Sequence, residues 1–216
     1  MHIKKLRHCA MVIDIPKKGG EAVRVLTDPG IYSLEEHDKV KGVDIVLITH
    51  EHADHFHIES LKALIKREPD VQIVTDVGVG TILAKEGVAH HVMEHGDAVD
   101  LKGVRIEAYG KDHAFLHESL PPMSNVGFFL ENKLFFPGDA FTDPKKPIDV
   151  LALPVAGPWM KISEAVNYAL EVKPRLAFPV HDAVRIATAH RIPEMILPKN
   201  GIEFVKLEEG GELDVR

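Results

Sequence analysis

The chain has 216 residues, a hydrophobic content of 45% and a charged content of 27%, which are the values of an ordinary soluble globular protein and predict one domain over residues 1–216. Its formal net charge of −7 disfavours broad attraction to nucleic acid as a partner. No apolar run approaches the roughly 18 residues needed to cross a bilayer, and the single cysteine cannot form an internal disulfide, so we expect a cytoplasmic protein that does not enter a membrane.

Short strands and turns alternate in the first third of the chain. The apolar stretch after the basic N-terminus is interrupted by Asp14, which makes it too short for a signal peptide and more typical of a strand. We predict strands over Ala10–Ile15, Ala22–Leu26 and Val43–Thr49. The dipeptide Pro29-Gly30 marks a sharp turn after the second of them.

The third predicted strand runs directly into a cluster of polar side chains. Three imidazoles and one carboxylate fall within six positions, at His50, His52, Asp54 and His55. A strand followed by a turn can point the first two the same way, while the last two return from the start of the next helix. Imidazole and carboxylate suit zinc, iron, manganese or nickel, whereas a structural zinc site would usually recruit thiolates. Chance clustering is the alternative in a chain with 14 histidines, but the arrangement favours a site for two metal ions.

The middle of the chain mixes helices with further strands. The segment Ile58–Ile65 has its apolar residues at helical spacing, and Pro69 ends it. The glycines at 78 and 80 lack a dinucleotide-binding pattern, so we interpret them as turn residues before a helix. The other elements predicted up to residue 136 are a strand over Val71–Thr75, a helix over Thr81–Lys85, strands over Val88–Met93 and Val104–Tyr109, and a hairpin of Gly127–Leu130 with Lys133–Phe136.

The last third alternates strands with helices. We predict strands over Val150–Leu153, Leu176–Val180 and Glu203–Leu207, and helices over Ile162–Val172 and Glu194–Leu197. The whole order fits two sheets packed face to face under outer helices, but it also suits a doubly wound fold. Periodicity alone leaves both architectures open.

Read at the end of a strand, the pattern His-x-His-x-Asp-His resembles the metallo-β-lactamase fold superfamily of metal-dependent hydrolases. That family has an ordered set of polar positions along its chain. Candidates for all of them occur here in the same order: Asp28, then His50, His52, Asp54 and His55, then His113, Asp139 and His181. The resemblance covers nearly the whole chain and implies an α+β fold, the four-layer αβ/βα sandwich of that family.

Two looser similarities indicate one branch of the family. The segments 153–158 (Leu-Pro-Val-Ala-Gly-Pro) and 179–181 (Pro-Val-His) are similar to segments of ascorbate-6-phosphate lactonase-like proteins. Short segments of this kind support a subfamily rather than a substrate.

The resemblance also implies a role for each of these side chains. His50, His52 and His113 would bind one divalent metal ion, Asp54, His55 and His181 would bind the other, and Asp139 would bridge the two. Zinc is the favoured metal, with manganese, iron and nickel as alternatives. Asp54 is expected to be catalytic, by orienting a metal-bound hydroxide or by shuttling a proton. Asp28 would hold a ligand histidine in its tautomer, or it would only stabilise the turn.

The expected function is hydrolysis of a small molecule with an ester-like, lactone or phosphorylated group. The apolar loop Phe115–Met123 and the segment around Trp159 could wall the substrate pocket, although Trp159 could equally be a core aromatic. A phosphodiesterase or nuclease with the same dinuclear centre is one alternative, and a non-catalytic metal-binding or sensing protein is another. The sequence leaves open whether the chain forms a homo-oligomer.

Overall fold

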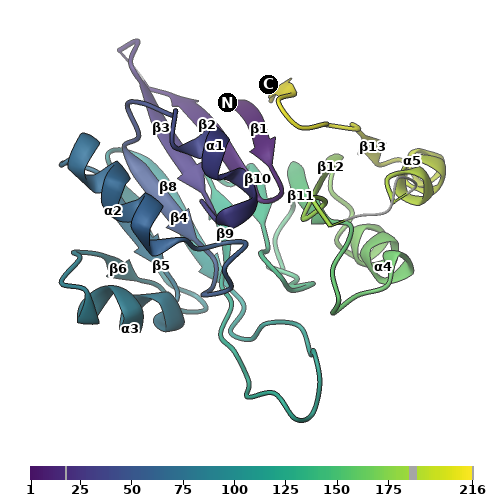
Figure 1. The fold of residues 1–216 in the computed structure, drawn as a ribbon. Helices are drawn as coiled ribbons and strands as arrows, with labels where there is room; N and C mark the ends of the chain where they lie inside the picture. The colour runs from purple at the N-terminus through teal and green to yellow at the C-terminus, as the bar shows by residue number, and fades with distance from the viewer. Residues whose placement is uncertain (18, 185–188, 216) are drawn as a thin grey trace.

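Two seven-stranded sheets face each other in the computed structural model, which describes residues 1–17, 19–184 and 189–215 (Figure 1). The first sheet contains β1 (His2–Arg7), β2 (Ala10–Pro16), β3 (Ala22–Thr27), β4 (Ile45–Ile48), β5 (Gln72–Thr75), β6 (His91–Val92) and β14 (Glu212–Asp214). These strands lie in the order β14-β1-β2-β3-β4-β5-β6. Pairing is antiparallel from β14 to β3 and parallel from β3 to β6.

The second sheet repeats this half-antiparallel, half-parallel plan. Its strands are β7 (Ala98–Leu101), β8 (Val104–Tyr109), β9 (Gly127–Leu130), β10 (Leu134–Phe136), β11 (Val150–Pro154), β12 (Leu176–Val180) and β13 (Glu203–Phe204). They lie in the order β13-β12-β11-β10-β9-β8-β7. Pairing is antiparallel from β7 to β10 and parallel from β10 to β13.

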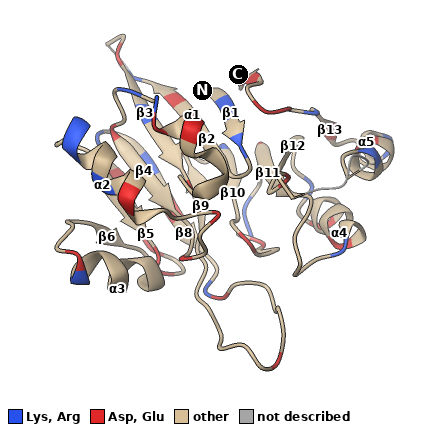
Figure 2. Cartoon of the chain, in the orientation of Figure 1, with Lys and Arg blue, Asp and Glu red and all other residues tan. Residues whose placement is uncertain are grey.

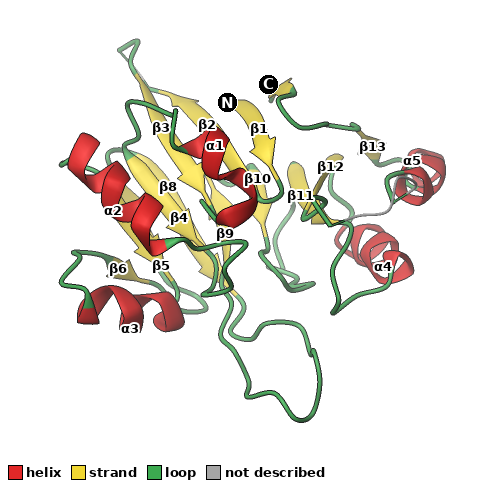
Figure 3. Ribbon diagram, viewed as in Figure 1, coloured by secondary structure: helices red, strands yellow, loops and turns green. Residues whose placement is uncertain are grey.

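Helices cover the outer face of each sheet (Figure 3). The first sheet is covered by α1 (Leu34–His37), α2 (Ile58–Arg67) and α3 (Val77–Lys85), and the second by α4 (Ile162–Val172) and α5 (Arg191–Ile196). Short 3-10 turns span Ile31–Ser33 and Pro198–Asn200. The predicted four-layer sandwich is therefore confirmed. Among the described residues, no helix has the length and hydropathy that crossing a bilayer requires.

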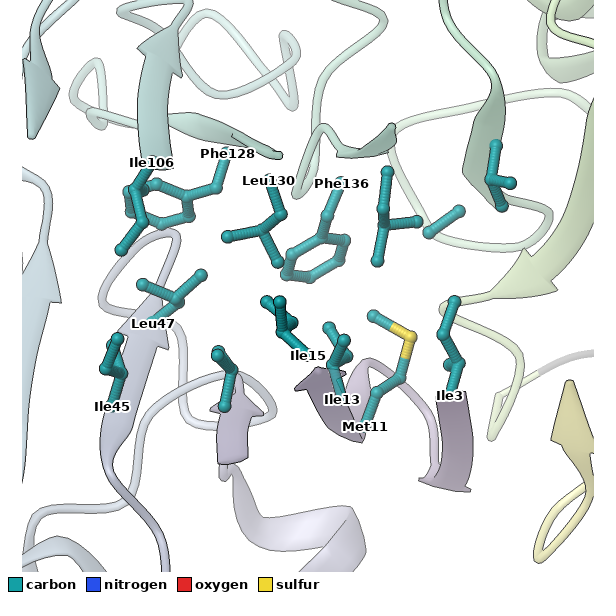
Figure 4. Close-up of a cluster of buried hydrophobic side chains, with 14 of the residues drawn as sticks. Ile3, Met11, Ile13, Ile15, Ile45, Leu47, Ile106, Phe128, Leu130 and Phe136 are labelled. Carbon is teal, nitrogen blue, oxygen red and sulfur yellow. The ribbon is translucent and has the colours of Figure 1, made fainter. Parts of the chain in front are cut away.

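The largest part of the core lies between the two sheets (Figure 4). Met11, Ile13 and Leu47 from the first sheet face Phe128 and Phe136 from the second, and all five side chains are fully buried. Alternate residues of the same strands pack outward against the helices. Strands such as β4 are thus buried on both faces, which explains why they read as continuous apolar runs in the sequence.

Five elements differ from the sequence-based expectations. The strands β1, β7 and β14 were not predicted, and the expected strand over Val88–Met93 shrinks to two residues. The helix expected from Thr81 begins at Val77, because the Asp76 side chain accepts a hydrogen bond from the Val79 amide and caps the helix there. The interpretation of the glycines at 78 and 80 as turn residues is therefore wrong. Both lie inside α3, where a Cβ on Gly80 would approach the Val92 side chain to 2.5 Å.

The topology brings the carboxyl ends of six strands to one edge of the sandwich. In the first sheet β1, β3 and β4 run in the same direction, and in the second sheet β8, β10 and β12 do. The predicted β9–β10 hairpin is confirmed, and two of its three loop residues, Glu131 (φ 53°) and Asn132 (φ 51°), adopt the left-handed backbone that a tight hairpin needs. Each predicted polar position follows one of five of these strands, β3, β4, β8, β10 or β12, and none follows β1.

Candidate metal centre

Eight histidine and aspartate side chains meet at this edge of the sandwich. They form two groups, His50, His52, His113 and Asp139 in the first, and His8, Asp54, His55 and His181 in the second. Within each group the candidate ligand atoms all lie within 4.8 Å of one another. The structure thus brings together all seven side chains that the resemblance selects, from four separate loops, and adds His8.

Asp139 lies between the two groups. Its Oδ2 atom is 2.9 Å from His181 Nε2 and 3.4 Å from His113 Nε2, and its Oδ1 atom is 3.2 Å from His55 Nε2. One carboxylate therefore faces histidines of both groups, as a bridging ligand requires. Only 3% of its side chain is exposed.

Several buried polar atoms at this point make no hydrogen bond. Among the described residues they include the Nε2 atoms of His55, His113 and His181 and the Oδ1 atom of Asp139. Buried polar atoms are normally paired, so a cluster of unpaired ones needs an explanation. Imidazole nitrogens and a carboxylate that converge without hydrogens between them fit a bound divalent cation.

A buried network behind the centre sets the tautomers of two histidines. Asp28 Oδ2 accepts hydrogen bonds from His55 Nδ1 at 2.6 Å and from Thr49 Oγ1 at 2.8 Å, while its Oδ1 accepts from the Thr49 amide at 2.8 Å. The one hydroxyl hydrogen of Thr49 is used on Asp28, so Thr49 Oγ1 accepts from His50 Nδ1 at 3.0 Å. When its ring is neutral, each of these histidines then presents an unprotonated Nε2 to the centre. Asp28 lies where the sequence-based prediction placed it, against a candidate ligand.

The electrostatics keep most of these groups in the forms that bind metal. Burial lowers the pKa of His50 well below its usual range. Burial raises the pKa of Asp139, but His55 and the other histidines outweigh it and hold the pKa well below normal. Burial also acts to lower the pKa of His55, yet the Asp139 and Asp28 carboxylates raise it well above normal. These carboxylates therefore stabilise positive charge at this point, which a cation would supply.

His8, in the turn after β1, was missed by the sequence reasoning. Its Nδ1 accepts a hydrogen bond from the Ala183 amide at 3.2 Å, so in the neutral ring the hydrogen sits on Nε2, 3.1 Å from Asp54 Oδ2. Burial lowers the pKa of His8 to about 4, which keeps the ring neutral near pH 7. His8 therefore donates to Asp54 and holds that carboxylate. No motif spacing marks it, because it is a single histidine outside the His-rich loop.

Trp159 also contacts the centre, although it does not line either of the two pockets beside it. Its indole Nε1 donates to Asp139 Oδ2 at 2.8 Å, and its ring lies 6.0 Å from the rings of His113 and His181. The ring also packs against Phe141, at 5.2 Å. Trp159 thus helps to fix the orientation of the central carboxylate.

Two glycines allow the loops to approach one another. A Cβ on Gly30 would lie 2.0 Å from the backbone carbonyl of Asp54, so only glycine fits there. Gly138 has a φ of 66°, and a Cβ on it would meet the Asn125 side chain, which accepts a hydrogen bond from the Asp139 amide at 3.0 Å. The loop after β3 is therefore packed directly on the His-rich loop.

Comparisons with known proteins agree with this geometry. The Beta-lactamase superfamily domain matches residues 2–181. The chain is 36% identical over 166 residues to Protein Rv0786c of Mycobacterium tuberculosis, covering 74% of this chain and 76% of that protein. It is 26% identical over 172 residues to the UPF0173 metal-dependent hydrolase MJ1163 of Methanocaldococcus jannaschii, covering 73% and 77%.

A solved structure confirms the architecture. The metallo hydrolase Igni18 from the archaeon Ignicoccus hospitalis superimposes with a TM-score of 0.75 over 100% of both chains, at 18% identity. That likeness is evidence for the shared fold, while the domain match and the Mycobacterium tuberculosis relative define the family. The chain belongs to the metallo-β-lactamase superfamily.

Proposed function

We propose that the protein uses a pair of divalent cations to hydrolyse a small molecule with an ester-like bond. The observation that carries the proposal is the convergence of unpaired, buried ligand atoms on both sides of one carboxylate. In this proposal His50, His52 and His113 hold one cation, Asp54, His55 and His181 hold the other, and Asp139 contacts both. Zinc is the favoured metal for such ligands, with manganese, iron and nickel as alternatives.

Bound cations of this kind acidify a water molecule, which becomes the nucleophile, and polarise the oxygen of the bond to be cleaved. Asp54 is the candidate for orienting that water. Burial raises the pKa of Asp54, but the His8 hydrogen bond and the neighbouring imidazoles lower it well below normal. A carboxylate that stays ionised in this way suits accepting a hydrogen bond better than retaining a proton. His8 Nε2 and Trp159 Nε1 then keep Asp54 and Asp139 in fixed orientations.

The substrate class in this proposal comes from the shape of the site and from the resemblance. Pockets of about 450 and 460 Å³ adjoin the two groups of ligands, and these volumes suit a small molecule. The similarity to ascorbate-6-phosphate lactonase-like proteins extends the candidates to lactones and phosphorylated sugar derivatives. Carboxylic esters and lactones share the electrophilic carbonyl that such a centre would attack.

The test is cation-dependent turnover. Protein stripped with a chelator and reloaded with Zn²⁺ or Mn²⁺ is assayed against p-nitrophenyl acetate, a lactone, bis(p-nitrophenyl) phosphate and a structured RNA. We expect hydrolysis of the ester and the lactone that requires the cation and is lost in Asp139→Asn. The control is Asp100→Asn, because Asp100 is 66% exposed and pairs with Arg105 at the surface.

The other outcomes identify the alternatives. Turnover of the phosphodiester or the RNA in preference to the esters would favour a phosphodiesterase or nuclease. Cation binding without turnover of any substrate would favour a metal-binding or sensing protein. If Asp139→Asn were as active as the unmodified protein, the metal centre would not take part in the reaction.

A further inference from the structure

Exposed apolar side chains gather around the candidate metal centre. In the described part of the chain, nine large apolar residues are exposed, and five of them line the two pockets beside the centre: Ile31, Tyr32, Val184, Phe115 and Leu120. Single exposed apolar residues are common and need no explanation. Their concentration at one place indicates a surface that meets an apolar group.

The pocket on the side of His52 and His113 is the more apolar of the two. It is walled by the loop between β8 and β9, whose lining residues include Phe115, Leu120 and a pair of prolines. Phe115 is 77% exposed and Leu120 is 52% exposed, although both stand next to a buried polar centre. This loop projects away from both sheets in Figure 1, and Figure 2 draws nearly all of it in tan, without charge.

The charged residues that line the pocket walled by the β8–β9 loop, here called the loop pocket, disfavour an anionic substituent there. Apart from histidines, the charged residues that line the loop pocket are Asp112 and Glu118, and in the other pocket the charged residue is Asp54. Among the described lining residues of both pockets there is no lysine or arginine. Phosphate groups are usually held by such cationic side chains or by helix N-termini. A phosphorylated substituent in the loop pocket would instead meet two carboxylates.

We propose that the substrate is a neutral carboxylic ester or lactone with an apolar substituent that packs against Phe115 and Leu120. This inference rests on the proposed function and narrows it. The carbonyl carbon lies at the metal centre, water adds to it, and the bond to the alcohol oxygen breaks. Water supplies the hydroxyl of the acid product and the proton of the alcohol product, so no further reactant is needed.

The test compares esters that differ only in chain length. Cation-loaded protein is assayed with p-nitrophenyl acetate, butyrate and hexanoate, and with p-nitrophenyl phosphate as the anionic counterpart. Each added methylene that leaves water is expected to raise kcat/KM by about fourfold until the pocket is filled. The phosphate monoester is expected to be the poorest substrate of the set.

The loop pocket is tested with a double variant, Phe115→Ser with Leu120→Ser. It should lower the ratio of kcat/KM for hexanoate to that for acetate by about tenfold, because the apolar contact is lost. Met195→Ser on α5 is the control, since Met195 is 49% exposed and lines neither pocket. We expect that control to keep the ratio of the unmodified protein.

The outcomes separate this inference from the function on which it rests. Equal kcat/KM for all esters, an unchanged ratio in the double variant, or faster turnover of p-nitrophenyl phosphate would overturn the apolar substrate class while leaving hydrolysis intact. Absence of turnover for every ester with every cation would instead contradict the proposed function itself.

Discussion

Replacing Asp28 by asparagine should weaken both cation sites at once. Asp28 Oδ2 accepts hydrogen bonds from His55 Nδ1 and from the Thr49 hydroxyl, and Thr49 in turn accepts from His50. In Asp28→Asn, the side-chain oxygen still accepts the hydrogen bond from the Thr49 amide. The NH₂ group then occupies the position of Asp28 Oδ2. The NH₂ donates to both neighbours, so the hydrogen of each histidine is driven from Nδ1 to Nε2. The hydrogen then occupies the Nε2 lone pair that would otherwise bind a cation.

The size of the effect follows from the hydrogen bonds involved. Keeping the metal-binding tautomers would leave buried donors facing each other, at a cost of about 1–3 kcal/mol. Substituting a residue that orients a metal ligand typically lowers affinity by about 10- to 100-fold, which is about 1.4–2.7 kcal/mol. The two figures agree. Because Asp28 reaches His55 directly and His50 through Thr49, the loss applies to both cations.

The assay is stepwise competition with a chelator of known affinity, on folded protein checked by circular dichroism. We expect both dissociation constants to rise in Asp28→Asn, whereas His181→Ala should weaken mainly the cation beside Asp54. Asp100→Asn, at the exposed surface, serves as the control. Unchanged affinities in folded Asp28→Asn would refute the tautomer argument, and loss at one site alone would refute the relay through Thr49.

Three further predictions concern residues outside the set of candidate ligands. Gly30→Ala should destabilise the protein by about 1–3 kcal/mol and lower its cation affinity, because the added Cβ would displace the Asp54 backbone. Unfolding in urea measures the first effect and chelator competition the second, and wild-type values in both would contradict the prediction. His8→Ala should lower the affinity for the cation beside Asp54 by about tenfold in the same competition assay. His8→Gln, which can still donate a hydrogen bond to Asp54, should recover part of that affinity. Equal affinities in the two variants would argue against a role for the hydrogen bond. Burial lowers the pKa of His37 to about 4, so the unfolded chain binds a proton below about pH 6.5 that the folded chain does not. The cation-free protein should therefore lose about 2 kcal/mol through His37 between pH 7 and pH 5, and His37→Gln should show a correspondingly smaller loss in urea unfolding; an identical loss would exclude this residue.

The candidate ligands could be predicted from the sequence because each follows a strand that is itself easy to identify. His50 to His55 follow the apolar run of β4, Asp139 follows the β9–β10 hairpin, and His181 follows β12. The resemblance selected these side chains, and they lie together because the carboxyl ends of parallel strands meet at one edge of a sheet. The resemblance then selected the sandwich over the doubly wound fold.

What the sequence did not reveal depends on contacts between distant segments. His8 acts on Asp54, 46 positions away, and Trp159 donates to Asp139, 20 positions away, and neither pair has a local spacing that marks it. The start of α3 was misplaced because the two glycines indicated a turn, and the cap provided by Asp76 was not recognised from the sequence. Both glycines are needed for close packing of α3, which propensity alone does not report.

The most direct test of the central claim is the divalent cation content of the purified protein and of Asp139→Ala, measured by metal analysis on folded samples. The account predicts about two cations per chain in the unmodified protein, as in other two-metal sites, and loss of both in the variant, because Asp139 faces both groups of ligands. Full cation content in Asp139→Ala would contradict it.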